Sequence, residues 1–494
     1  LLADLDLQVP SLIFTNTRAQ AERWFALLQQ ALPADKIGLH HGSLDLAIRR
    51  EVEAGIKSGS LKAVVATSSL DLGVDYSPIK RVYQIGSPKA VARMIQRAGR
   101  GFHSPGTPCE IRYLPTYGLE LLEIDAVGAA IAKGEVEEQG HYSQPIDVLT
   151  QFLVNCAVGD GFHPDQLFAV VTAAYSFQEM TREEFDWVVD FAGKGGTSLS
   201  AYPQYRRFAA EPDGRFVCGD RRIVLDHKMN VGTILSDATI PLRLQRGGQI
   251  GTIEERFLAG LKPGDVFQFG GQSLQFVRLT ERQGLVAKAP GKAKVTPRWF
   301  GSKFAFSPVV TRNIRQVLAE PERFHNAAAI LQAQSRHSRL PGPDEVLMEV
   351  GEFQSQHGFF CYPMEGEYVN QALAVLLSLR LTRGVTTTFA ITANDYGFCL
   401  LCDEPFPFAA NLPDDVFSLD GLEEDIAAGI NLSQFAKQHF REICRIAGLV
   451  KQTGPGRKKS MRQMSLSSGL LFDVFVKFDP DNRLLQKAHH EILY

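Results

Sequence analysis

Short apolar segments alternate with amphipathic segments over the first 114 residues, and this pattern restricts the fold more than any other feature of the sequence. Runs such as Ser11–Phe14 are short enough for buried strands, whereas residues 18–31, 46–58 and 90–99 have the apolar spacing of helices. Strands that alternate with helices are typical of a parallel sheet covered by helices on both faces. We therefore predict a multidomain α/β protein whose first domain, residues 1–135, has this architecture.

The rest of the chain is too long to belong to that first domain. Single cores stop growing at about 250–300 residues, and the sequence has 494. Residues 140–222 contain three helix-like segments followed by a β-hairpin, the order of a winged helix. Residues 223–306 are rich in short β segments with Gly-containing turns, which predicts a barrel-like domain. Residues 307–494 mix helical and β-like runs and are predicted to form an α+β domain.

Composition excludes a membrane-spanning protein and a strongly basic one. Hydrophobic residues make up 45% of the sequence, but no apolar run approaches the roughly 18–20 residues that a membrane span needs. The net charge of −3 means that any contact with nucleic acid must come from local groups. Seven Cys without a framework spacing fit a reducing compartment, so we expect a cytoplasmic protein. The start at Leu1 instead of Met indicates a piece of a longer chain.

Three polar segments directly follow predicted strands of the first domain. Because the carboxyl ends of parallel strands line one edge of a sheet, these segments should converge. Helix N-termini favour phosphate groups there, and hydroxyls suit contacts to a nucleic-acid backbone, while a carboxylate can accept a hydrogen bond from a sugar hydroxyl. The candidate nucleic-acid-binding residues of these segments are Thr15, Asn16, Thr17, Arg18, His41, Gly42, Ser43, Thr67, Ser68, Ser69 and Asp75.

A fourth segment, QRAGRG, places two arginines at the end of a predicted helix, and we expect it to converge on the same edge of the sheet. A permanently charged, forked guanidinium suits the charge that develops on a transferring γ-phosphate, where such an arginine contributes about 10³–10⁵ in rate. Gln96, Arg97 and Arg100 are therefore candidate catalytic residues, and Gly73 and Asp75 would complete a nucleotide site with the two arginines. The alternative interpretation of the arginines is a solvated or salt-bridged helix end.

A second candidate site lies in the segment PRWFGSK, where aromatic and basic residues are interleaved on a loop shaped by Gly and Pro. Such loops bind single strands, and stacking of a base on an aromatic ring contributes about 1–3 kcal/mol. Trp299 is the predicted stacking platform and Lys303 its basic neighbour. The alternative is an ordinary core tryptophan.

Two other groups of residues could suggest metal or redox chemistry. His40 and His41 are adjacent, so on a strand they would point to opposite faces, and no partners at ligand spacing follow them. Cys399 and Cys402 lie within an apolar run without a second pair, so we predict buried small hydrophobic residues. We therefore predict no metal site.

In order and spacing, the four segments resemble motifs IV, IVa, V and VI of superfamily 2 helicases, which lie on the second of two RecA-like domains. The segments VVATSSLDLGVD and QRAGRGFH are similar to those of large-helicase-related (Lhr) helicases. Thr233 and Ile234 in HKMNVGTI, the segment EERFLAGLKPGDVFQFGG and NDYGF resemble the DNA ligase-associated bacterial subgroup. The resemblance covers nearly the whole chain. The sequence departs from the usual superfamily pattern at one position, because His103 stands where that pattern has a third arginine.

The resemblance implies an ATP-dependent 3′-to-5′ DNA helicase or translocase that serves DNA repair in the bacterial cytoplasm, at the nucleoid. Asp75 would contact a ribose, Arg97 and Arg100 would face ATP on a neighbouring domain, and the Trp299 loop would stack on the tracking strand. The substrate would be single-stranded DNA or DNA with a 3′ tail, and the subgroup suggests DNA ligase and nuclease partners.

The motifs that hold nucleotide phosphates in such helicases are missing from the sequence. It contains neither G-x-x-x-x-G-K-[ST] nor an Asp-Glu-x-His segment, so ATP and Mg²⁺ would bind mainly to a preceding domain. We therefore expect this chain alone to be inactive as an ATPase. Two alternatives stay open: an autonomous single-strand-binding module without ATPase activity, and a helicase that acts mainly on RNA–DNA hybrids.

Overall fold

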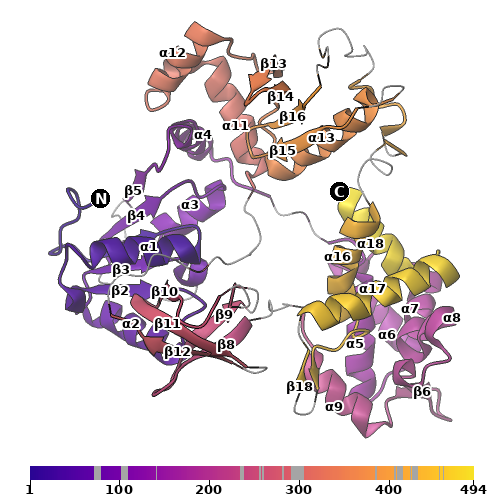
Figure 1. Ribbon diagram of the computed structural model, residues 1–494. Helices are drawn as coiled ribbons and strands as arrows, with labels where there is room; N and C mark the ends of the chain where they lie inside the picture. The colour runs from indigo at the N-terminus through magenta and orange to yellow at the C-terminus, as the bar shows by residue number, and fades with distance from the viewer. Residues whose placement is uncertain are drawn as a thin grey trace. The chain divides into compact units, whose positions relative to one another are not determined.

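The computed structural model divides the chain into two compact units, residues 1–138 with 239–416 and residues 139–238 with 417–494 (Figure 1). The residues that the structure describes are 1–71, 79–101, 110–138, 140, 142–233, 239–254, 257–258, 261–280, 283–290, 297, 305–383, 387–404, 406, 408, 416–422, 424–425, 432–454, 457–459 and 461–493. Within these ranges, no helix is both long and apolar enough to cross a membrane.

A parallel five-stranded sheet forms the centre of the first part of the chain, as the sequence predicts. Its strands are β1 (Ser11–Phe14), β2 (Ile37–His40), β3 (Ala63–Ala66), β4 (Arg81–Ile85) and β5 (Ile111–Leu114), in the order β2-β3-β1-β4-β5. Most of their residues are buried, which is typical of parallel strands that are covered on both faces.

Helices cover both faces of this sheet. They are α1 (Arg18–Leu28), α2 (Leu46–Ser58), α3 (Val91–Ala98) and α4 (Glu120–Lys133). Successive residues of a strand point to opposite faces, so Ile13 packs in the same core as α1, whereas Leu12 packs in the core that contains Ile56 of α2. The predicted α/β fold of this domain is confirmed.

A second five-stranded sheet packs against the α1 side of the first one. It consists of β8 (Thr239–Leu244), β9 (Gln249–Glu254), β10 (Val266–Phe269), β11 (Gln272–Leu279) and β12 (Gly284–Lys288), in the order β10-β11-β12-β8-β9. Its neighbouring strands are antiparallel except for β12 and β8. Inward-facing side chains of this sheet share one hydrophobic core with α1 and the parallel sheet.

The remainder of this unit is an α+β arrangement. Helices α11 (Pro308–Ala319) and α12 (Ala328–His337) precede a four-stranded antiparallel sheet, and α13 (Glu367–Leu381) lies within the same segment of chain. The sheet strands are β13 (Leu347–Phe353), β14 (Gln356–Tyr362), β16 (Phe398–Cys402) and β15 (Ala390–Ala393), in that spatial order. Helix α11 packs against α4, so this part shares a core with the first domain.

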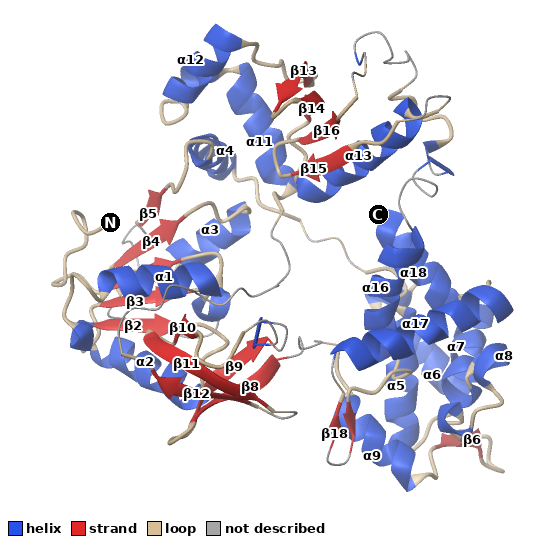
Figure 2. Ribbon diagram, viewed as in Figure 1, coloured by secondary structure: helices blue, strands red, loops and turns tan. Residues whose placement is uncertain are grey.

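The second unit is mostly helical (Figure 2). The predicted winged-helix order is present as three helices, followed by the single turn α8 and a short hairpin. Thr181 and Glu184 form a capping box at the start of the third helix. The elements of this winged-helix part are α5 (Ile146–Val158), α6 (Pro164–Thr172), α7 (Arg182–Lys194), α8 (Gly196–Leu199), β6 (Ala209–Ala210), β7 (Phe216–Val217) and α9 (Arg221–Asn230).

The C-terminal segment belongs to this second unit, which corrects the predicted single domain over residues 307–494. Phe440 and Phe475 pack in the same core as Leu153 and Phe191 of the winged helix, so the hydrophobic surface of these last helices is buried there. The predicted start of the β-rich domain at residue 223 is also wrong, because α9 continues to Asn230. The C-terminal elements are α16 (Leu432–Ile446), β17 (Thr453–Gly454), β18 (Arg457–Lys458), α17 (Met461–Phe478) and α18 (Arg483–Leu493).

Candidate nucleotide and nucleic-acid site

Arg97 lies at the carboxyl edge of the parallel sheet, where it contacts polar groups on β4 and in the segments that follow β1 and β3. Its Nε is 3.0 Å from Asp71 Oδ1, and its Nη1 donates to Gln84 Oε1 at 2.6 Å and to Asn16 Oδ1 at 3.3 Å. The guanidinium carbon is 5.0 Å from the centroid of the Phe14 ring. The end of α3 is therefore fixed to the strand ends by one side chain.

This geometry defines the surroundings of Arg97, which the sequence proposes as a catalytic and nucleotide-binding residue. The residue is only 1% exposed, and its guanidinium already has internal partners. Burial lowers the pKa of Arg97, and the neighbouring Asp71 carboxylate opposes that effect. The salt-bridged helix end, which the sequence left open as the alternative, describes this residue in the structure. The contacts of Arg97 hold the end of α3 at the sheet edge.

Arg100 and Gln96 occupy more accessible positions at the same end of α3. Gln96 is exposed and Arg100 is half-buried, and the backbone N–H of Arg100 donates to the carbonyl of Arg97 at 3.0 Å. Of the two arginines, Arg100 is therefore the more exposed one. Gly73 and Asp75, the other predicted nucleotide-binding residues, lie outside the described residues.

The segment between β1 and α1 forms a capped helix start. Thr17 is the N-cap of α1 and forms a capping box with Gln20. Thr15 is buried and donates to the carbonyl of Thr17 at 3.2 Å, while the side-chain amide of Asn16 donates to the carbonyl of Ser87. Thr17 is exposed, but the predicted contacts of Thr15 and Asn16 to nucleic acid conflict with these internal bonds.

The His41–Ser43 segment lies beneath the second sheet. His41 Nε2 is 3.1 Å from Glu22 Oε1, and Ser43 Oγ accepts from Arg18 at 2.9 Å. Both His41 and Ser43 are buried, whereas Gly42 is exposed. Of the three residues predicted to contact nucleic acid in this segment, only Gly42 is therefore exposed in the structure.

Sequence reasoning missed the groups that join the two sheets here. Glu22 is buried and accepts from the backbone N–H groups of Gly270 and Gly271. A Cβ on Gly271 would lie 2.3 Å from a ring carbon of Phe25, and this glycine has φ +72°. The paired glycines in DVFQFGG were the available signal, because such positions often mark close backbone approach.

Three hydroxyl residues follow β3, and their environments differ. Thr67 is buried, Ser68 is exposed, and Ser69 Oγ lies 2.8 Å from His40 Nδ1. His40 Nε2 lies 3.1 Å from Glu53 Oε1, and burial lowers the pKa of His40. Ser68 is therefore the hydroxyl residue whose side chain is accessible to a nucleic-acid strand, while Ser69 and His40 stabilise the loop.

The second predicted site cannot be placed in the same way, because Trp299 and Lys303 lie outside the described residues. Cys399 and Cys402 are on β16, where Cys402 is buried and Cys399 is partly exposed. Burial raises the pKa of Cys361, on the neighbouring strand, to about 12, so this thiol stays protonated. No group of three or more possible metal ligands occurs among the described residues.

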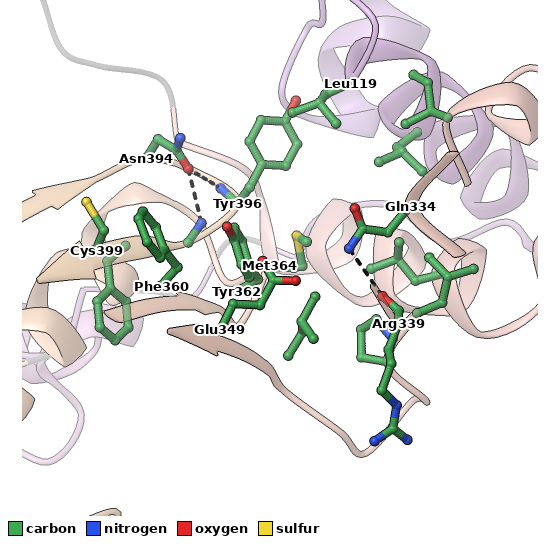
Figure 3. Close-up of a pocket in the computed structure, with 18 of the residues that line it drawn as sticks. Leu119, Gln334, Arg339, Glu349, Phe360, Tyr362, Met364, Asn394, Tyr396 and Cys399 are labelled. Atoms are coloured by element: carbon green, nitrogen blue, oxygen red, sulfur yellow. Dashed lines mark hydrogen bonds between the residues drawn. The ribbon is translucent and has the colours of Figure 1, made fainter. Parts of the chain in front are cut away.

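One cavity in the described part of the chain lies away from the strand-end edge. It has a volume of about 370 Å³ and lies between α4, α12 and the antiparallel sheet (Figure 3). Most of its lining is apolar, with Asn394, Gln334 and Glu349 among the polar groups. None of the predicted site residues is among those that line it.

Models of three protein families match the chain in sequence order. The helicase conserved C-terminal domain matches residues 4–103, the winged helix domain of large helicase-related proteins matches 129–296, and the DEAD/H associated model matches 340–494. The parallel sheet is thus a helicase C-terminal domain. With the winged helix and DEAD/H associated regions that follow, the chain belongs to the Lhr-type helicase family.

Similar proteins extend over nearly all of the chain. It is 27% identical to the ATP-dependent helicase Lhr-Core protein 2 of Thermococcus barophilus, covering 98% of this chain and 59% of the relative. It is 25% identical to the Lhr helicase and probable uracil glycosylase of Mycolicibacterium smegmatis, covering 92% of this chain and 32% of the relative. The chain thus spans only part of the length of these relatives.

A solved structure shares the fold. The structure of Mycobacterium smegmatis helicase Lhr bound to single-stranded DNA and AMP-PNP matches with a TM-score of 0.74 at 22% identity. The match covers 98% of this chain and 61% of that one. The order of domains is therefore that of a solved Lhr helicase.

Proposed function

We propose that this chain is the C-terminal part of an ATP-dependent 3′-to-5′ DNA helicase or translocase. The observation that carries the proposal is the strand-end edge, where Arg97 is locked by Asp71 and the half-buried Arg100 follows it at the end of α3. An accessible arginine beside a rigid partner is suited to stabilise charge on a γ-phosphate. The ssDNA and AMP-PNP in the M. smegmatis structure support the same chemistry.

ATP and Mg²⁺ would bind mainly to a domain outside this chain. The sequence contains no phosphate-cradling loop, and the chain covers 56–59% of four Lhr-Core relatives. Closure of that domain on the strand-end edge would bring Arg100 to the nucleotide. Gly73 and Asp75, which follow β3 in the sequence, are proposed to contact the nucleotide, and the chain alone would not hydrolyse ATP.

The nucleic-acid strand is proposed to follow the exposed groups at the same edge. These groups are Thr17, Gly42 and Ser68, with Arg18 beside them. The buried Thr15, Ser43 and Thr67 would hold the backbone of the neighbouring exposed residues in position. Trp299 and Lys303, farther along the chain, remain the proposed stacking site. We also propose work in DNA repair at the bacterial nucleoid, with DNA ligase and nuclease partners, on the basis of subgroup resemblance.

The decisive residue test is Arg100→Ala in the complete protein of which this chain forms a part. We expect DNA-stimulated ATP hydrolysis to fall by about 10³-fold or more, because transition-state charge loses its partner. Arg23→Ala, which removes an exposed arginine on α1, is the matched control and should leave the rate unchanged. Unchanged hydrolysis in Arg100→Ala would remove this assignment.

The alternatives give different outcomes in the same preparation. An autonomous single-strand-binding module would bind single strands without hydrolysing ATP. A helicase for RNA–DNA hybrids would unwind a hybrid duplex faster than a DNA duplex of matched sequence. We expect DNA-stimulated hydrolysis and faster unwinding of the DNA duplex.

A further inference from the structure

Lys89 lies in the loop between β4 and α3 and reaches into the C-terminal α+β part of the same unit. Its Nζ is 3.1 Å from Asp395 Oδ2 and 3.6 Å from Glu123 Oε1, and it lies 4.2 Å from the centroid of the Phe306 ring. The side chain of Lys89 is only 17% exposed. A buried cation with two carboxylates and an aromatic face has one defined position.

The partners of Lys89 are themselves fixed. Asp395 Oδ1 accepts from the backbone N–H groups of Phe306 and Glu367 at 3.0 and 3.2 Å. Tyr396 donates its hydroxyl to Glu123 of α4. Asn394 Oδ1 accepts from the N–H groups of Tyr396 and Gly397, as Figure 3 shows. The NDYGF segment, which the proposed function does not use, thus supplies a rigid anchor.

The backbone of the same loop is held from several sides. Lys89 has φ +64°, a conformation that residues other than glycine adopt only where the surroundings impose it. Its carbonyl accepts from the N–H of Ser307 at 3.0 Å. Glu137 accepts from the first two N–H groups of α3, at Val91 and Ala92, each at 2.7 Å. The start of α3 is therefore positioned by groups outside the parallel sheet.

We propose that Lys89, Glu123, Asp395 and Tyr396 form a latch by which the C-terminal α+β part sets the position of α3 and, through it, of Arg100. A helix carries a displacement of its first turn to its last turn, because it is a rigid element. Arg100 follows the last turn of α3. The latch rests on the proposed function, and it makes Lys89 and Asp395 positioning residues for ATP hydrolysis.

The test compares Lys89→Met with Lys133→Met in the complete protein. Lys133 also joins α4 to α11, through Asn313 and Gln316, but it makes none of the contacts to the loop before α3. Lys89→Met should lower kcat of DNA-stimulated ATP hydrolysis by about tenfold or more, with KM for ATP unchanged, since misplacement of a group that acts in the transition state affects kcat. Lys133→Met should leave both constants unchanged, and Lys89→Arg should retain most of kcat.

Hydrogen exchange on the same proteins provides a readout that does not depend on ATP hydrolysis. Backbone amides of residues 86–98 should exchange faster in Lys89→Met than in Lys133→Met or the unmodified protein. Equal exchange in this segment together with an unchanged kcat would overturn the latch. If the unmodified protein shows no ATP hydrolysis but Lys89→Met still loosens residues 86–98, the proposed function fails while the positioning contact stands.

Discussion

At the scale of single residues, the most informative contact is the buried pair of Arg97 and Asp71. The sequence predicted that the arginines of QRAGRG would reach the strand-end edge, and Arg97 does so. It could not predict that Asp71 and Gln84 would bind the guanidinium, because these partners are 26 and 13 residues away in the chain. Arg97 and Arg100 look equivalent in the sequence, but in the structure they differ in burial, because Arg97 is buried and Arg100 is half-buried.

A stability prediction follows from this pair. Asp71→Ala should lower the free energy of unfolding of the first unit by about 3–5 kcal/mol, because it leaves the Arg97 guanidinium buried without its carboxylate. Asp35→Ala, which removes an exposed partner of Lys36 in the same unit, should cost less than about 1 kcal/mol. Urea denaturation measures the free energy of unfolding of both variants. Equal decreases would show that the buried pair stabilises the protein no more than the exposed pair does.

The pH dependence of stability is a second residue-scale prediction. Burial holds the pKa of His40 below its ordinary value of 6.5, so the unfolded chain takes up a proton first as the pH falls. The contribution of His40 to stability is thus present above about pH 6.5 and is lost as the pH falls through the folded pKa. Replacement by Asn should flatten this part of the curve of unfolding free energy against pH. An unaltered slope would contradict the assignment.

At the scale of elements, the strands and helices of the parallel sheet could be predicted because their apolar pattern is local. The covered His41–Ser43 segment could not, because burial there depends on β9 and β10, about 200 residues later. Thr252 donates from β9 to the carbonyl of Ser43 at 2.8 Å, and this contact has no local signal. The accessibility of candidate residues such as Thr15, His41 and Ser43, which are buried, could therefore not be predicted from the local sequence.

Two glycines provide a prediction at this scale. Gly128 lies in the middle of α4 with open space around its Cα, so Gly128→Ala should stabilise the protein by about 0.5–1 kcal/mol through helix propensity. Gly271→Ala should destabilise it by about 1–3 kcal/mol, because the new methyl group meets Phe25 at a junction between sheets. Thermal unfolding of the two variants checks the signs, and the same sign for both would contradict this packing.

At the scale of the whole molecule, the sequence predicted the kinds of domain but not which segments of the chain form each compact unit. Residues 417–494 share a core with the winged helix, although about 190 residues separate them from its last helix. The order of segments in the sequence does not show that a late segment packs against an earlier domain. The two compact units each combine an early and a late segment, so each unit depends on both halves of the sequence.

The most direct test of the helicase proposal is strand separation by the complete protein on a DNA duplex with one single-stranded tail. We predict ATP-dependent unwinding of the duplex with a 3′ tail, and none when the tail is on the 5′ side or when ATP is replaced by AMP-PNP. Unwinding only from the 5′ tail, or none on either substrate despite tight binding of single strands, would contradict the account.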